Sequence, residues 1–143
     1  MTGDGREPAG PRDCAGEIRV LVVDDHPLVR TALADMFDGE DDVTVVGQCE
    51  DGSQVVEAAA RLDPDVVCMD VSMPLMDGLT ATEALRASRS DVRIVLLTSQ
   101  PTARPEVAAA GAQALVPKTA RPDSLLRCLR AVASGSSGCP YCL

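Results

Sequence analysis

Five short apolar runs, the first of them rich in β-branched residues, alternate along the chain with stretches whose apolar residues recur at helical spacing. The runs cover residues 18–24, 43–47, 65–70, 92–98 and 112–117. Strands that are covered on both faces appear as continuous apolar runs, and right-handed crossovers place the intervening helices on both faces of one sheet. The alternation therefore predicts a doubly wound α/β fold built on a parallel sheet.

The helices are predicted between and after these runs. The first begins at Pro27 and ends at Gly39, and three others cover residues 55–62, 79–87 and 122–134. The stretch between the fourth and fifth runs, SQPTARPEVAAAG, contains two prolines. Pro105 can occupy a first helical turn, whereas Pro101 prevents the helix from extending backwards. We therefore expect a shortened helix here.

The chain of 143 residues is long enough for one domain with its own core. Residues 17–134 hold all the predicted strands and helices and form this domain. Residues 1–16 are rich in glycine, proline and charge and lack the apolar stretch of a secretory signal, so we expect a flexible arm; residues 135–143 form a C-terminal tail. No uncharged apolar run is long enough to cross a bilayer. We expect a cytoplasmic protein without membrane contact.

The charge balance argues against a nucleic-acid-binding surface. The chain has 22 acidic and 13 basic residues and a net charge of −9, which repels phosphates. Its aromatic residues are Phe37 and Tyr141, so a platform for base stacking is missing. We expect no direct nucleic-acid binding by this chain.

Polar side chains stand where the predicted strands end. They are Asp24, Asp25, Asp70, Thr98 and Lys118. A single aspartate after a strand is usually a helix cap or a solvated residue of a turn. In a parallel sheet, however, the carboxyl ends of the strands share one edge, where ligands bind. We therefore expect these five side chains to converge.

Three clustered carboxylates repel one another unless a cation neutralises them. His26 is the chain's only histidine, so neither a zinc site built on histidines nor a phosphohistidine relay is expected. Hard carboxylate oxygens favour Mg²⁺. An aspartate beside Mg²⁺, with a lysine and a hydroxyl opposite, is a nucleophile suited to phosphoryl transfer.

Four stretches, LVVDDHPLVRTAL, VVCMDVSMPLMDG, RIVLLTS and GAQALVPK, closely resemble the receiver domain of bacterial two-component response regulators. The similarity is greatest to receivers that precede LuxR-type helix-turn-helix domains, and it covers about residues 17–134. It implies a flavodoxin-like (βα)5 fold. It also implies a role in a phosphorelay, not an enzyme's turnover of a small substrate.

The resemblance implies a role for each site residue. Asp70 would accept a phosphoryl group from the phosphohistidine of a histidine kinase. Thr98 would donate its hydroxyl to a phosphoryl oxygen, and Lys118 would pair with the phosphate. In the loop after the strand that ends at Asp70, Gly78 would permit unusual backbone dihedral angles.

The implied metal ligands bind Mg²⁺ through oxygen. Asp25 would bind the ion directly, Asp24 chiefly through water, and Asp70 through its carboxylate. Ser72 would contribute its backbone carbonyl.

The sequence also departs from the family. Leu115 stands where the family usually has an aromatic switch residue, three positions before Lys118, and the fourth helix is short. These departures predict a weaker switch than usual and a monomer or weak homodimer. The resemblance therefore favours a stand-alone receiver that signals to an unknown downstream protein. A truncated LuxR-type transcription regulator, a phosphorylation-independent pseudo-receiver and a dithiol oxidoreductase stay as alternatives.

The last alternative rests on CPYC, residues 139–142, which matches a dithiol motif of glutaredoxins. No thioredoxin-like element follows it, and two cysteines are too few for a closed zinc site. The other cysteines, Cys14, Cys49, Cys68 and Cys128, suit reduced thiols that act as small hydrophobes. We expect residues 135–143 to be a tail without a site.

Overall fold

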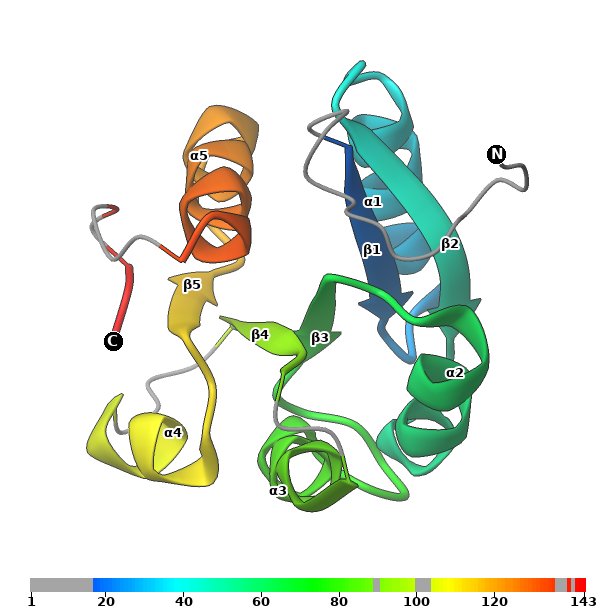
Figure 1. Cartoon of the computed structure of the whole chain (residues 1–143), viewed down its shortest axis with the longest axis vertical. Coiled ribbons are helices and arrows are strands. Elements are labelled where there is room, and N and C mark those ends of the chain that lie inside the picture. The colour runs from blue at the N-terminus through cyan, green and yellow to red at the C-terminus, as the bar shows by residue number, and fades with distance from the viewer. Residues whose placement is uncertain (1–16, 89–90, 100–103, 136–138, 140) are drawn as a thin grey trace.

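The computed structural model describes residues 17–88, 91–99, 104–135, 139 and 141–143. Five parallel strands form one sheet in the order β2-β1-β3-β4-β5 (Figure 1). They are β1 (Ile18–Val23), β2 (Val43–Cys49), β3 (Val66–Asp70), β4 (Arg93–Thr98) and β5 (Ala114–Pro117). The predicted parallel α/β fold is confirmed, and each strand lies within two residues of its predicted bounds.

Among the described residues, four α-helices and one 3₁₀ turn connect the strands, and a fifth α-helix follows the last strand. They are α1 (Pro27–Asp38), the turn η2 (Gly52–Gln54), α2 (Val55–Leu62), α3 (Gly78–Ser88), α4 (Arg104–Ala110) and α5 (Pro122–Ala133). Helix α4 is described over seven residues, with Pro105 second among them, and the segment before it, residues 100–103, lies outside the described residues. Pro101 lies outside the described residues, as does the predicted arm of residues 1–16.

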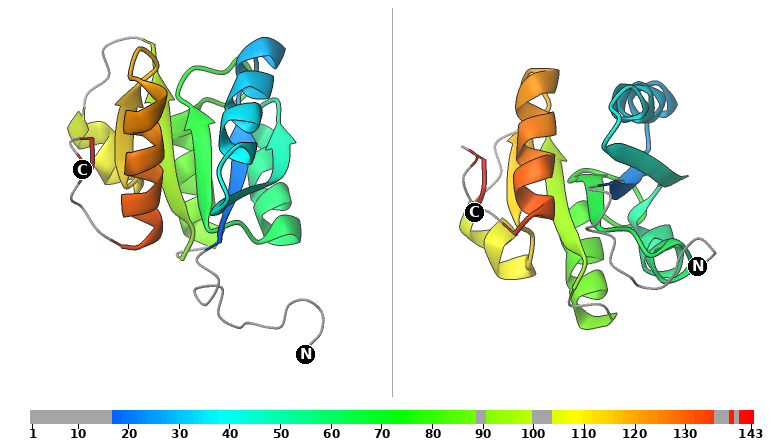
Figure 2. Two further views of the ribbon diagram at one scale, coloured as in Figure 1. Left: turned by 90° about the horizontal axis from the view of Figure 1, so that it is seen from above. Right: turned by 45° about the horizontal axis from the view of Figure 1, so that its top comes forward.

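Two apolar clusters, one on each face of the sheet, form the core. Phe37 of α1 and Leu129 of α5 belong to one cluster, and Leu85 of α3 and Val107 of α4 belong to the other together with α2. Helices α1 and α5 therefore cover one face and α2, α3 and α4 the opposite face (Figure 2). Covered on both sides, β3 is buried along its whole length, as a continuous apolar run predicts.

The tail is not loose where the structure describes it. Cys142 forms an antiparallel bridge with Ala114, the first residue of β5. The Leu115 N–H donates to the Tyr141 carbonyl at 3.1 Å, and the Leu143 N–H donates to the Gln113 carbonyl at 3.0 Å. Since β5 is the last strand of the sheet, its outer edge offers free backbone groups. Residues 141–143 extend the sheet there, which apolar periodicity did not predict.

None of the helices among the described residues is both long and apolar enough to cross a membrane.

Candidate functional site

Two carboxylates are buried at the carboxyl ends of the neighbouring strands β1 and β3. Asp24 is 0% exposed and Asp70 is 2% exposed. Oxygen or nitrogen atoms of Asp24, Asp25, His26 and Asp70 all lie within 4.8 Å of one another. The predicted convergence of these acids is observed, and it creates a small region of concentrated negative charge.

Lys118 bridges the two buried carboxylates. Its Nζ lies 3.1 Å from Oδ2 of Asp24 and 3.1 Å from Oδ2 of Asp70. Burial raises the pKa of Asp70 above its ordinary value; Lys118 opposes this rise, and the charge of Asp24 adds to it. Burial alone would lower the pKa of Lys118, but hydrogen bonds to Asp24 and Asp70 raise it above its ordinary value. The ammonium therefore stays charged at neutral pH.

Backbone groups fix the orientation of both buried carboxylates. The His26 N–H donates to Oδ1 of Asp24 at 2.9 Å, and the Ser72 N–H donates to Oδ1 of Asp70 at 3.2 Å. In each acid, one oxygen thus accepts a hydrogen bond from a backbone N–H, and the other is paired with Nζ of Lys118. Both carboxylates are therefore oriented through contacts to both of their oxygens.

Asp25 has an oxygen that lacks a donor. Its Oδ1 is buried and accepts no hydrogen bond from the described part of the chain. Nδ1 of His26 is 3.2 Å away, but without the geometry of a hydrogen bond. A buried carboxylate oxygen that accepts no hydrogen bond, beside two further carboxylates, fits a divalent cation with a preference for oxygen ligands.

Thr98 ends β4, the strand between β3 and β5. Its carbonyl accepts a hydrogen bond of 2.7 Å from the Lys118 N–H, and its neighbour Leu97 pairs with Asp70 across the sheet. The chain segments that carry Asp70, Thr98 and Lys118 are therefore side by side. Ser72 is exposed and lies two residues after the end of β3. All the predicted site residues thus lie on segments that meet at this edge of the sheet.

Comparison with known proteins agrees with this geometry. Residues 20–130 match the response regulator receiver domain. The chain belongs to this family. It is 39% identical over 121 residues to the transcriptional regulatory protein LiaR of Bacillus subtilis, a match that covers 82% of this chain and 57% of LiaR. This receiver chain thus spans little more than half the length of that relative.

Solved receiver structures have the same fold. A LuxR-family response regulator from Aurantimonas superposes with a TM-score of 0.80 at 27% identity, covering 84% of this chain and 87% of that chain. The receiver domain of the putative response regulator NarL from Mycobacterium tuberculosis gives 0.79 at 28% identity, covering 83% and 98%. The flavodoxin-like receiver fold is confirmed.

Asp51 is a part of this receiver that the sequence analysis missed. It follows β2 and is 6% exposed. Its Oδ2 accepts the Ser53 N–H at 2.8 Å, and its Oδ1 accepts the N–H groups of Leu75 and Met76 at 3.1 and 3.3 Å. Asp51 therefore fixes the loop that follows Asp70. The sequence Asp-Gly-Ser directly after a strand is a capping signal that could have identified it.

Position 78 requires glycine because the backbone there lies close to the backbone of Asp70 and Val71. A Cβ there would lie 2.5 Å from the Asp70 carbonyl oxygen and 2.9 Å from the Val71 Cα. Gly78 begins α3, and the positive φ angles among described glycines are at Gly111 and Gly135. The expectation of an unusual dihedral angle was therefore wrong; the start of α3 packs directly against the end of β3.

Proposed function

We propose that this receiver accepts a phosphoryl group on Asp70 from the phosphohistidine of a histidine kinase. The observation that carries the proposal is the position of Asp70, a buried carboxylate oriented by the Ser72 N–H and paired with Lys118 at 3.1 Å. Family membership supports the same chemistry. The proposal does not depend on the length of the chain.

The transfer is a substitution at phosphorus. A carboxylate oxygen of Asp70 forms a new bond to phosphorus while the bond between phosphorus and the kinase imidazole breaks, and the imidazole keeps the electron pair and takes up a proton. The product is an acyl phosphate. Its charge, about −1.5 to −2 for a phosphoryl group near neutral pH, attracts the Lys118 ammonium. Thr98 donates its hydroxyl to a phosphoryl oxygen.

Mg²⁺ is the proposed cofactor. Asp24, Asp25 and Asp70 would hold it with the backbone carbonyl of Ser72, and the buried Oδ1 of Asp25, which accepts no hydrogen bond among the described residues, supports this assignment. When bound, the ion offsets negative charge on the phosphoryl oxygens and on the donor. The protein's own contribution is to hold the three carboxylates in one place, so that no large rearrangement precedes binding.

The output is proposed to be contact with another protein. The net charge of −9 disfavours binding of this chain to DNA. A transcriptional role is the second candidate, because LiaR is named a transcriptional regulatory protein and this chain spans 57% of it. In that case the DNA contacts would come from a region of such a regulator outside the part that this chain matches.

Chemical phosphorylation tests the proposal. The protein is incubated with Mg²⁺ and acetyl phosphate and its intact mass is measured. Wild type should gain one phosphoryl group, and Asp70→Asn none, because an amide oxygen is a poor nucleophile. Asp77→Asn is the matched control, since Asp77 lies in the following loop and caps α3 through the Thr80 N–H at 2.8 Å. EDTA should abolish the reaction. A folded wild type that stays unlabelled would favour the pseudo-receiver alternative.

A further inference from the structure

Three cysteine thiols meet at the outer edge of the sheet, away from the carboxylates. Cys128 comes from α5, and Cys139 and Cys142 come from the CPYCL segment, residues 139–143, of which Pro140 lies outside the described residues. Their Sγ atoms all lie within 4.8 Å of one another, and those of Cys139 and Cys142 are 2.9 Å apart. Cys142 pairs with Ala114 at the start of β5, whereas Lys118 follows the strand's end.

The third thiol changes the conclusion drawn from the sequence. CPYC alone supplies two cysteines, which are too few for a zinc site, and Cys128 is far from them along the chain. The structure brings Cys128, which is 0% exposed, against Cys139, which is 7% exposed. Cys142 is partly exposed and completes the group. Solvent can therefore reach the cluster from the side of Cys142.

Packing alone explains the other buried thiols but is a weaker explanation here. Cys49 and Cys68 are each buried in an apolar surrounding, as small hydrophobes are. Cys128 and Cys139 belong to the same apolar cluster as Cys68, and Cys142 packs against it, but these three cysteines also bring three soft ligand atoms within 4.8 Å of one another. Thiolate sulfur selects soft ions such as Zn²⁺ over Mg²⁺ or Ca²⁺.

We propose that Cys128, Cys139 and Cys142 bind Zn²⁺ through three thiolates, with water as the fourth ligand. Zinc–sulfur bonds of about 2.3 Å in a tetrahedron place the sulfur atoms about 3.8 Å apart. The observed separations, from 2.9 Å to at most 4.8 Å, bracket this value, so the three sulfur atoms already lie near the spacing of zinc ligands. Binding releases three thiol protons to solvent and leaves a site with a net charge of −1.

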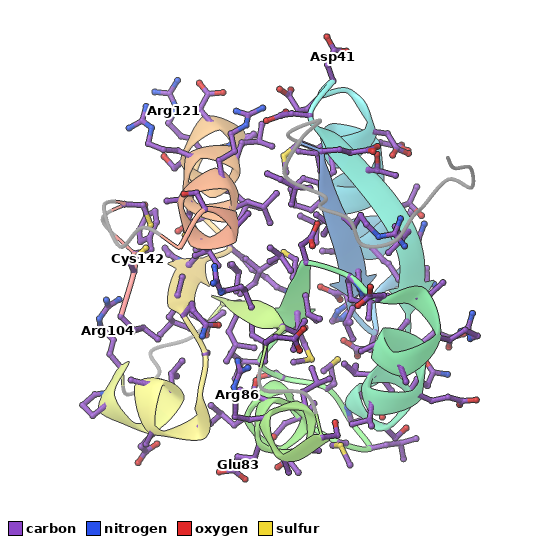
Figure 3. All side chains as sticks on the ribbon, viewed as in Figure 1. Asp41, Glu83, Arg86, Arg104, Arg121 and Cys142 are labelled. Atoms are coloured by element: carbon purple, nitrogen blue, oxygen red, sulfur yellow. The ribbon has the colours of Figure 1, made fainter. Side chains whose placement is uncertain are left out.

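Neighbouring contacts support the site from outside. The Arg104 guanidinium donates through Nη2 to the Cys142 carbonyl at 2.9 Å, which holds the backbone of Cys142 in place. Figure 3 shows Arg104, at the start of α4, and Cys142 on the same side of the molecule, near α5. Backbone bonds from Leu115 and Leu143 hold the segment against β5. The site thus joins α4, β5 and α5.

Bound zinc would stabilise the position of the CPYCL segment against β5 and α5. An ion that binds only the folded segment stabilises it, so zinc would add to the backbone bonds that hold residues 141–143 against β5. With zinc bound, the segment covers the outer edge of β5, the strand that carries Leu115. This inference goes beyond the proposed phosphoryl transfer and does not depend on it.

Zinc binding is tested on the full chain with Cys14→Ser as the parent, because Cys14 lies outside the described residues and could add a ligand. The protein is stripped with a chelator, kept in reductant with saturating Mg²⁺, and titrated with Zn²⁺. Native mass spectrometry should show one zinc per chain, and competition with a chromophoric chelator should give its affinity. Replacing Cys139 or Cys142 with serine should weaken binding about tenfold or more. Cys49→Ala is the matched control and should bind as the parent does.

A second measurement follows the backbone. In the parent, zinc should slow amide exchange at Leu115 and Leu143, and it should not do so in Cys142→Ser, whose change lies at a partly exposed position. The triple variant Cys128→Ala/Cys139→Ser/Cys142→Ser lacks all three thiols, so any zinc that it still binds measures binding to the carboxylates. Equal zinc binding by the triple variant and the parent would overturn the proposal. It would equally be overturned if the reduced parent bound no zinc, in which case the thiols only pack together.

Discussion

Lys118 and Asp70 form an ion pair of 3.1 Å across β4, because Lys118 follows β5 and Asp70 ends β3. The same ammonium lies 3.1 Å from Asp24. One cation is therefore shared between two buried acids before phosphorylation. A phosphoryl group on Asp70 would change how this single positive charge is divided, so Lys118 is placed to sense the modification.

The first prediction concerns Lys118. Lys118→Met keeps the apolar stem and removes the charge, so the fold and at least part of the chemical phosphorylation should persist. The structural response to phosphorylation should weaken, because no ammonium follows the new charge. Amide exchange of β5 and α4, measured with and without a stable phosphoryl mimic, gives this response. An unchanged response would mean that Lys118 serves only to offset the carboxylates.

Because Lys118 is the chain's only lysine, its own titration can be observed directly. Its pKa is raised in the folded state, so its contribution to stability is complete below the unfolded pKa of about 10.4 and is lost as the pH rises through the folded value. Nitrogen NMR of the side-chain ammonium should show this shift in wild type. The shift should shrink in Asp70→Asn, which removes one of the two partners.

The second prediction concerns the stability cost of Asp70. Burial raises its pKa, so the ionised carboxylate destabilises the folded state at neutral pH. Asp70→Asn should therefore raise the free energy of unfolding at pH 7 in EDTA, and the gain should vanish as the pH falls toward the unfolded pKa of about 3.9. Urea unfolding at several pH values measures this. Lower stability of Asp70→Asn at pH 7 would mean that attraction to Lys118 outweighs burial.

The third prediction concerns Asp51. Asp51→Ala leaves three backbone N–H groups without an acceptor and should cost about 2 kcal/mol of unfolding free energy. Asp77→Ala, which removes one exposed cap, should cost about 1 kcal/mol and serves as the control. Urea unfolding at neutral pH compares the two. Equal costs would mean that the bonds to Leu75 and Met76 add nothing.

The effect of Asp51 should depend on pH. Burial raises its pKa, but hydrogen bonds from Ser53, Met76 and Leu75 lower it by more, so it lies below its ordinary value. The stabilisation is therefore present above the unfolded pKa of about 3.9 and is lost as the pH falls through the folded pKa. The difference in unfolding free energy between wild type and Asp51→Asn should shrink correspondingly in acid.

The sequence predicted the strands and the convergence of the site residues, because both depend on local patterns along the chain. Apolar runs gave the strands, and the rule that parallel strands end at one edge brought Asp24, Asp70 and Lys118 together. The pairing of residues 141–143 with β5 could not be predicted, because a short tail has no periodicity and its partner is a sheet edge. The contact of Cys128 with CPYC depends on that pairing. It therefore became visible only with the fold.

The last prediction is that phosphorylation changes the face formed by α4 and β5 less than is usual for the family. Coupling requires that the switch residue have two well-defined positions. Leu115 is already 5% exposed and has no polar tip that solvent would draw outward, while its N–H is held by Tyr141. The seven residues of α4 also offer a small surface for a second copy. A stable phosphoryl mimic should therefore change amide exchange over residues 104–118 only slightly, and light scattering should report a monomer or weak dimer.

Leu115→Tyr restores an aromatic ring with a polar tip and should enlarge the exchange response. Strong protection together with a tight dimer in wild type would show that leucine and a short helix are sufficient for the switch.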